Sequence, residues 1–163
     1  MIYWFWGYPG IGKDYVAKIF GEVTYTTYLN GDSFLTEGEK KKLLAGTFSS
    51  EDRLKKLKRI SRYLQKFKKD IVITDSLPDV NSRKFLKKTF KKNIIFILVK
   101  SSPRNHKKQT RERKEHFFSY DLIEKYIQKN WEPVRGFPHL TFWNEKKTKI
   151  EIKNDLLKIY KKT

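Results

Sequence analysis

The chain has 163 residues, of which 38% are hydrophobic, enough for one domain with a buried core, and this composition excludes an intrinsically disordered chain. It has no cysteine, which excludes disulfides and thiolate metal sites and favours the reducing cytoplasm as its location. The 37 Lys and Arg against 18 Asp and Glu give a net charge of +19, and the longest apolar run, residues 94–99, is too short to cross a membrane.

The first half of the chain predicts strands and helices in alternation. Residues 2–6 are a continuous apolar run that ends at a glycine, a pattern typical of a buried parallel strand. Residues 49–52 (SSED) resemble a helix start, and apolar residues follow at helical spacing. These apolar positions are Leu54, Leu57, Ile60, Tyr63, Leu64 and Phe67. The predicted elements are a strand at 2–6, a helix at 12–20, a strand at 26–29 and helices at 37–45 and 49–67.

The second half continues the alternation. Residues 94–99 are fully apolar, which predicts a strand inside the sheet. Residues 104–114 are strongly basic and predict a helical lid that extends over roughly 103–118. In chain order, the predicted elements are a strand at 71–74, a helix at 81–90, a strand at 94–99, helices at 104–114 and 119–129, a strand at 140–143 and a helix at 152–160.

This order of elements predicts one domain over residues 1–163, because no linker, repeat or low-complexity segment divides the chain. Strands that alternate with helices imply an α/β fold, with a five-stranded parallel sheet covered by helices on both faces. Ligands bind to such sheets beyond the carboxyl ends of the strands. We therefore expect the functional residues to follow the predicted strands.

The segment after the first strand is close to the phosphate-binding pattern G-x-x-x-x-G-K-[ST] and predicts a P-loop NTPase fold. Glycines let the loop wrap its N–H groups around a phosphate, the following helix adds its positive end, and Lys13 would bridge the β- and γ-phosphates. The expected ATP-binding residues are Gly7, Tyr8, Pro9, Gly10, Ile11, Gly12, Lys13, Asp14 and Tyr15.

Position 14 departs from the pattern, which has Ser or Thr there as a Mg²⁺ ligand. The Asp14 carboxylate can also bind Mg²⁺, directly or through water, but it adds negative charge near the phosphates. Asp75 ends the third predicted strand, a position from which a carboxylate reaches the Mg²⁺ shell, although it could equally cap a turn. Asp14 and Asp75 are thus candidate metal ligands.

Beyond the loop, the chain resembles the small P-loop kinases of the gluconokinase and adenylylsulfate kinase group over nearly its full length. Residues 29–32 (LNGD) resemble the L-D-G-D segment of the family, and residues 48–53 (FSSEDR) with 58–60 (KRI) are similar to the F-S-x-x-x-R…R-R-I stretch of adenylylsulfate kinases. Residues 113–118 (RKEHFF) and 131–133 (WEP) are more similar to gluconokinases. The resemblance implies phosphoryl transfer from ATP, with Mg²⁺ as cofactor.

The resemblance also implies roles for individual side chains. Asp32 would orient or deprotonate the acceptor hydroxyl, or hold Mg²⁺ through water, although a turn-forming role is the alternative. Arg53 and Arg83 would bind the acceptor, because arginine offers a planar fork to anionic oxygens, and Arg83 falls near an arginine of both families. Arg111 and Arg113 in the lid would place positive charge on the transferring group.

Three functions remain open. The first is a kinase for a small hydroxylated, anionic or nucleotide-like metabolite. The second keeps the chemistry but takes a nucleic acid as acceptor, such as a polynucleotide 5′-hydroxyl, and the charge of +19 favours it because such a field attracts polyanions. That charge could instead reflect a general lysine bias with solvated helix faces. The third is a non-catalytic nucleotide-binding module in which Asp14 has impaired Mg²⁺ chemistry.

Overall fold

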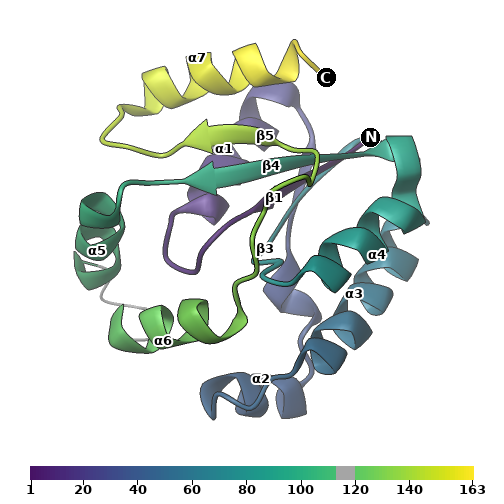
Figure 1. The fold of residues 1–163 in the computed structure, drawn as a ribbon. Coiled ribbons are helices and arrows are strands. Elements are labelled where there is room, and N and C mark those ends of the chain that lie inside the picture. Colours follow the sequence, from purple (N-terminus) through teal and green to yellow (C-terminus); the bar gives the residue numbers. More distant parts are fainter. Residues whose placement is uncertain (113–119) are drawn as a thin grey trace.

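The computed structural model describes residues 1–112 and 120–163, and in these residues five strands form one parallel sheet in the order β2-β3-β1-β4-β5 (Figure 1). The middle strand is the apolar N-terminal run, and the apolar run at 94–99 is also inside the sheet. The strands are β1 (Ile2–Trp6), β2 (Thr27–Asn30), β3 (Ile71–Asp75), β4 (Ile94–Lys100) and β5 (Leu140–Trp143). The predicted α/β fold with a five-stranded parallel sheet is confirmed.

Helices connect the strands, and most begin and end within a few residues of the predicted bounds. Ser49 caps α3 as its sequence predicts, since its hydroxyl accepts from the Asp52 N–H while the Asp52 carboxylate accepts from the Ser49 N–H. The α-helices are α1 (Lys13–Thr24), α2 (Glu37–Leu44), α3 (Ser50–Leu64), α4 (Val80–Phe90), α5 (Pro103–Glu112), α6 (Tyr120–Asn130) and α7 (Lys149–Tyr160). Two short 3₁₀ helices are η1 (Gly31–Phe34) and η2 (Lys91–Asn93).

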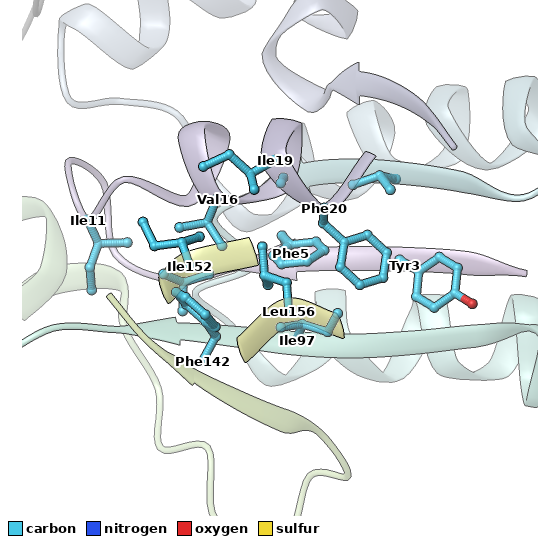
Figure 2. Close-up of a cluster of buried hydrophobic side chains, with 13 residues drawn as sticks. Tyr3, Phe5, Ile11, Val16, Ile19, Phe20, Ile97, Phe142, Ile152 and Leu156 are labelled. Carbon is cyan, nitrogen blue, oxygen red and sulfur yellow. The ribbon is translucent and has the colours of Figure 1, made fainter. Parts of the chain in front are cut away.

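One face of the sheet is covered by α1 and α7. Phe5 of β1 and Ile97 of β4 point to this face and pack against Phe20 of α1 and Leu156 of α7 (Figure 2). These side chains are fully buried, so the face provides a hydrophobic core that fixes the start of α1 over β1. The loop between β1 and α1 is thereby held at the carboxyl edge of the sheet.

The opposite face is covered by α3 and α4. Trp4 and Trp6, which alternate with Phe5 along β1, point to this face and are fully buried against residues such as Leu57 of α3 and Leu86 of α4. Of the apolar residues at helical spacing, Tyr63 is 40% exposed, and Phe67 lies just after α3, which ends at Leu64. The buried side of α3 also includes Arg53 and Lys56, which the sequence analysis did not assign to the core.

At the carboxyl edge of the sheet, α5 and α6 lie beyond the ends of β4 and β5 (Figure 1). The predicted lid corresponds in part to α5, and the rest of the lid lies outside the described residues. Among the helices that the structure describes, none combines the length and apolar character needed to cross a bilayer.

Candidate active site

The loop between β1 and α1 has the backbone conformation of a phosphate cradle. Gly10 and Gly12 have φ angles of 79° and 84°, in the left-handed region that favours glycine. A Cβ atom on Gly10 would lie only 2.7 Å from the Thr110 hydroxyl of α5, so a side chain there would also collide with the neighbouring helix. The loop therefore keeps its N–H groups at the start of α1, where a helix attracts anions.

Two polar side chains from the second half of the chain hold this loop. His106 Nε2 of α5 lies 2.8 Å from the Pro9 carbonyl oxygen, and Asn144 Nδ2, just after β5, donates to the Ile11 carbonyl oxygen at 2.8 Å. Asn105 Nδ2 in turn donates to the Asn144 carbonyl oxygen at 3.0 Å. The sequence analysis missed these residues because they are distant from the loop along the chain and form no local motif.

Lys13 and Asp14 open α1 and line the cleft beside the loop. In the described residues no carboxylate forms an ion pair with Lys13, so its ammonium group is available to an anionic ligand. Asp14 Oδ1 accepts hydrogen bonds from the Thr74 hydroxyl at 2.6 Å and the Tyr28 hydroxyl at 3.1 Å. Burial raises the pKa of the Tyr28 hydroxyl, which keeps it a donor to this carboxylate.

The carboxyl ends of β2 and β3 meet at a buried lysine that the sequence analysis missed. Lys56 of α3 is 3% exposed, and its Nζ lies 2.9 and 3.0 Å from the two oxygens of Asp75. The same ammonium is 3.5 Å from Asp32 Oδ1. Burial alone lowers the pKa of Lys56, but the attraction of Asp75 and then of Asp32 outweighs it, so the pKa is raised above its ordinary value.

Asp75 and Asp32, two of the candidate metal ligands, differ in whether they reach the cleft. Asp75 is buried against Lys56 and does not line the cleft, so the structure does not bring it to the expected metal site. Asp32 on η1 lines the cleft, and 65% of its side chain is exposed. The structure therefore brings Asp14 and Asp32, rather than Asp75, to the surface that a Mg²⁺–phosphate group could reach.

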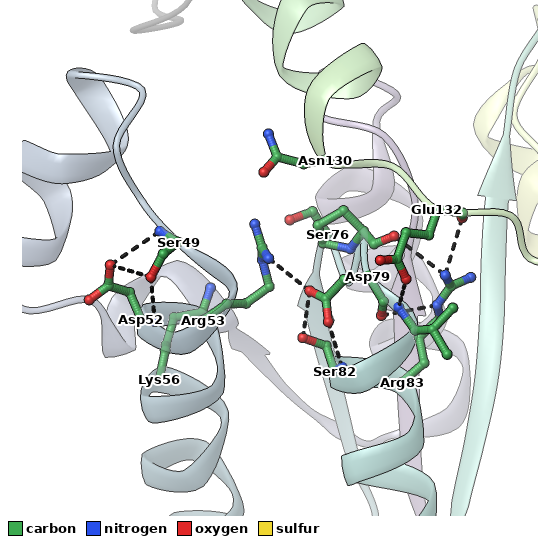
Figure 3. A network of polar contacts seen from close by, with 12 residues as sticks. Ser49, Asp52, Arg53, Lys56, Ser76, Asp79, Ser82, Arg83, Asn130 and Glu132 are labelled. Carbon is green, nitrogen blue, oxygen red and sulfur yellow. Dashed lines mark hydrogen bonds and ion pairs between the residues drawn. The ribbon is translucent and has the colours of Figure 1, made fainter.

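The two candidate arginines also differ in position (Figure 3). Arg53 lines the cleft, donates to Asp79 Oδ2 at 2.7 Å and to the Tyr126 hydroxyl at 3.3 Å, and is nevertheless buried. Burial lowers the pKa of its guanidinium, but Tyr126 and Asp79 outweigh this effect and raise it above its ordinary value. Because these two bonds use only part of its donor fork, Arg53 can still bind an anionic group.

Arg83 does not reach the cleft, contrary to its expected contact with the acceptor. Its side chain is 1% exposed and donates to the carbonyl oxygens of Pro78, Asp79 and Glu132. The guanidinium also lies 5.3 Å from the Trp6 ring centroid. Arg83 thus joins the start of α4 to the segment after α6, and its first-turn position, four residues after the Asp79 cap, explains this geometry.

Of the two lid arginines expected at the transferring group, only Arg111 lies within the described residues. Arg111 lies on the exposed side of α5 and does not line the cleft. Arg113, the other cation expected to act on the transferring group, lies outside the described residues. The described part of the lid contacts the phosphate loop through His106 rather than through an arginine.

The loop and the acceptor-side residues open onto one cleft of about 350 Å³. Gly10, Gly12 and Lys13 form its phosphate side, while Asp32 and Arg53 line it further along. Apolar side chains of α2, α6 and the segment before α3 complete the walls, including Leu43, Phe48 and Leu122. A nucleotide phosphate and a second small molecule could therefore meet in one partly apolar enclosure.

No protein-family model matches the sequence, and no curated protein matches it by sequence. Solved structures match the fold over nearly the full chain. A gluconokinase from Sinorhizobium meliloti 1021 superposes with a TM-score of 0.79 at 19% identity, over 99% of this chain and 96% of its own. A sugar kinase from Janibacter sp. HTCC2649 superposes with a TM-score of 0.82 at 16% identity, over 98% of this chain and 94% of its own.

An APS kinase from Mycobacterium tuberculosis, solved with AMPPNP and APS, superposes with a TM-score of 0.67 at 18% identity, over 98% of this chain and 95% of its own. The fold of this chain is therefore that of the small P-loop kinases, as the resemblance in the sequence implied.

Proposed function

We propose that this protein is an ATP-dependent kinase that transfers the γ-phosphoryl group to a hydroxyl of a small, anionic acceptor. The observation that carries the proposal is the shared cleft, which has the glycine loop and Lys13 on one side and Asp32 and Arg53 on the other. The structural neighbours are a gluconokinase, a sugar kinase and an APS kinase, which supports a small molecule as acceptor.

In the proposed reaction the loop N–H groups bind the ATP phosphates, and Lys13 neutralises charge on the β- and γ-phosphates. Arg53 binds the anionic group of the acceptor and holds its hydroxyl in line with the γ-phosphorus. The hydroxyl oxygen bonds to phosphorus as the bond to the bridging oxygen of ADP breaks. Asp32 takes the hydroxyl proton, because it is the exposed carboxylate on the acceptor side.

Magnesium fits the oxygen donors of this cleft, since Asp14 and Asp32 both line it and carboxylates are ligands that Mg²⁺ accepts. When bound, the ion supplies positive charge to the phosphates. Asp75 fits less well, because Lys56 already neutralises it. We therefore assign Asp14 the place that Ser or Thr takes in the usual loop.

The test is transfer of radiolabelled γ-phosphate from ATP to gluconate, shikimate, APS, nucleosides and a 5′-hydroxyl oligonucleotide. We expect one small anionic acceptor to be labelled by the wild type and not by Lys13→Ala. Labelling of the oligonucleotide alone would support the polynucleotide alternative instead. ATP binding without transfer to any of these acceptors would support the non-catalytic alternative, and equal labelling by Lys13→Ala would refute the assignment of the loop.

A further inference from the structure

A second group of exposed basic side chains does not line the cleft and forms no ion pair among the residues that the structure describes. On α3 and just after it, Lys58, Arg62 and Lys66 are exposed and follow one another at four-residue spacing. On α4, Lys84, Lys87 and Lys88 are exposed. The two helices pack side by side over one face of the sheet (Figure 1), and we call these six residues the α3–α4 basic face.

The sequence around this face contains no acidic residue from position 53 to 69 or from position 80 to 93. On α7, by contrast, Lys149 and Lys153 pair with Glu22, and Lys158 pairs with Asp155. A general lysine bias would not explain this difference between α7 and the α3–α4 basic face. Like charges at four-residue spacing also destabilise a helix, so the arrangement favours a polyanionic partner that would neutralise them.

Two partly exposed aromatic rings lie on α3 and just after it, beside the α3 cations of this face. Tyr63 and Phe67 are 40% and 38% exposed, and their ring centroids are 5.0 Å apart. Arg62 and Lys66 are their immediate neighbours in sequence, and the Phe34 ring packs edge-on against Tyr63 with ring centroids 5.2 Å apart. Accessible aromatic faces among cations match a strand whose bases stack on the rings while its phosphates pair with lysine and arginine.

We propose that the α3–α4 basic face, with Tyr63 and Phe67, binds single-stranded nucleic acid. Duplex DNA would satisfy the cations but not the aromatic rings, because its bases are stacked inside. An anionic membrane fits less well, because the apolar side of α3 is turned into the core and the exposed residues of α4, Asn81, Lys84, Lys87 and Lys88, include no apolar side chain. None of these residues lines the cleft, so this site is separate from that of the proposed kinase reaction.

The test is fluorescence anisotropy of the full chain with a fluorescein-labelled 20-nucleotide oligo-dT at several salt concentrations. The variant Lys84→Gln/Lys87→Gln/Lys88→Gln should bind at least tenfold more weakly. Its slope of log affinity against log salt should fall by about 2, since each phosphate contact on a single strand contributes about 0.7. Circular dichroism would verify that the variant is folded.

A matched control removes three charges from another surface through Lys146→Gln/Lys161→Gln/Lys162→Gln, all of which are exposed. We expect less than a twofold change in this control. An equal loss in both triple variants would show that only net charge matters and would overturn the proposal. Displacement of the oligonucleotide by millimolar ATP would place it in the cleft and would overturn it as well.

The variant Tyr63→Ala/Phe67→Ala tests whether bases stack on the two rings. It should weaken oligo-dT binding by roughly fivefold or more without changing the slope of log affinity against log salt, because stacking is not ionic. Tyr25→Ala removes an exposed ring elsewhere and should have no effect. Binding to vesicles of phosphatidylserine and phosphatidylcholine, with none to oligo-dT, would identify the face as a membrane surface and refute nucleic-acid binding.

Discussion

Replacing Lys56 by Met keeps the volume of the side chain but removes the ammonium group that faces Asp75. Both side chains are almost completely buried, and Nζ lies 2.9 Å from the nearer Asp75 oxygen. Removal of one partner of a buried ion pair costs about 3–5 kcal/mol, because the remaining charge loses its compensation. For a chain of this size, each kcal/mol corresponds to about 2–4 °C, so Tm should fall by roughly 6–20 °C.

The assay is urea and thermal unfolding of Lys56→Met beside Lys55→Met. Lys55 precedes Lys56 on α3 but forms an exposed pair with Glu51, which contributes little to stability because water screens it. The double variant Lys56→Met/Asp75→Asn should recover part of the lost stability, since it leaves no uncompensated charge. Equal losses in Lys56→Met and Lys55→Met would refute the role of Lys56 as a buried counter-ion.

The free energy of unfolding should depend on pH through Lys56, and because the pKa of Lys56 is raised in the folded protein, the sign of this dependence can be worked out. A group with a folded pKa above its unfolded value stabilises the protein at pH below the unfolded value, about 10.4 for lysine, and loses this effect as pH rises through the folded pKa. The stability difference between wild type and Lys56→Met should therefore be constant near neutral pH and shrink above about pH 10. A difference that grows with alkaline pH would contradict the ion pair.

The remaining predictions concern the loop and the two arginines. Lys13→Ala should reduce transfer by at least about 100-fold in a γ-phosphate assay without lowering Tm, because no ion pair is lost. Asp14→Ser should keep transfer while Asp14→Ala raises the Mg²⁺ concentration needed for half-maximal rate; complete loss in the serine variant would show that the carboxylate itself is required. Gly10→Ala should weaken ATP binding, measured by calorimetry, because its Cβ meets the Thr110 hydroxyl at 2.7 Å. Arg53→Met should raise the KM for the acceptor, whereas Arg83→Met should lower Tm with little change in this KM. The reverse pattern would show that Arg83, rather than Arg53, binds the acceptor.

Much of the fold could be predicted because it depends on local periodicity. The apolar run at 2–6 and the glycines that follow give β1 and the loop directly, and the cap at Ser49 marks the start of α3. The roles of Arg53 and Lys56 could not be predicted in this way, since they depend on Asp79, which follows β3, and on Asp75, which ends it, and both are distant in the sequence. Sequence spacing alone does not show which carboxylates a topology brings to a helix.

A signal for the buried cations was nevertheless present on α3. Arg53, Lys56, Leu57 and Ile60 recur at spacings of three, one and three residues, which place them on one side of a helix. The sequence analysis considered only the apolar residues of this helix, including Tyr63, which is 40% exposed, and not the cations beside them. Two basic residues in register with core positions indicate that buried acids neutralise them, but only the structure shows that these acids are Asp75 and Asp79.

The two sides of the cleft differ in how far their cations are paired with carboxylates. The acceptor side is internally balanced, because Arg53 and Lys56 of α3 each face a buried aspartate. On the phosphate side, Lys13 has no carboxylate partner in the described residues, so its charge is not neutralised within the protein. A triphosphate that enters the cleft therefore meets more uncompensated positive charge at the loop than at α3, whereas the remaining donors of Arg53 are left for the smaller anionic group of the proposed acceptor. This asymmetry supports the proposal that the triphosphate binds at the loop and that Asp32, the exposed carboxylate on the acceptor side, receives the proton of the acceptor hydroxyl.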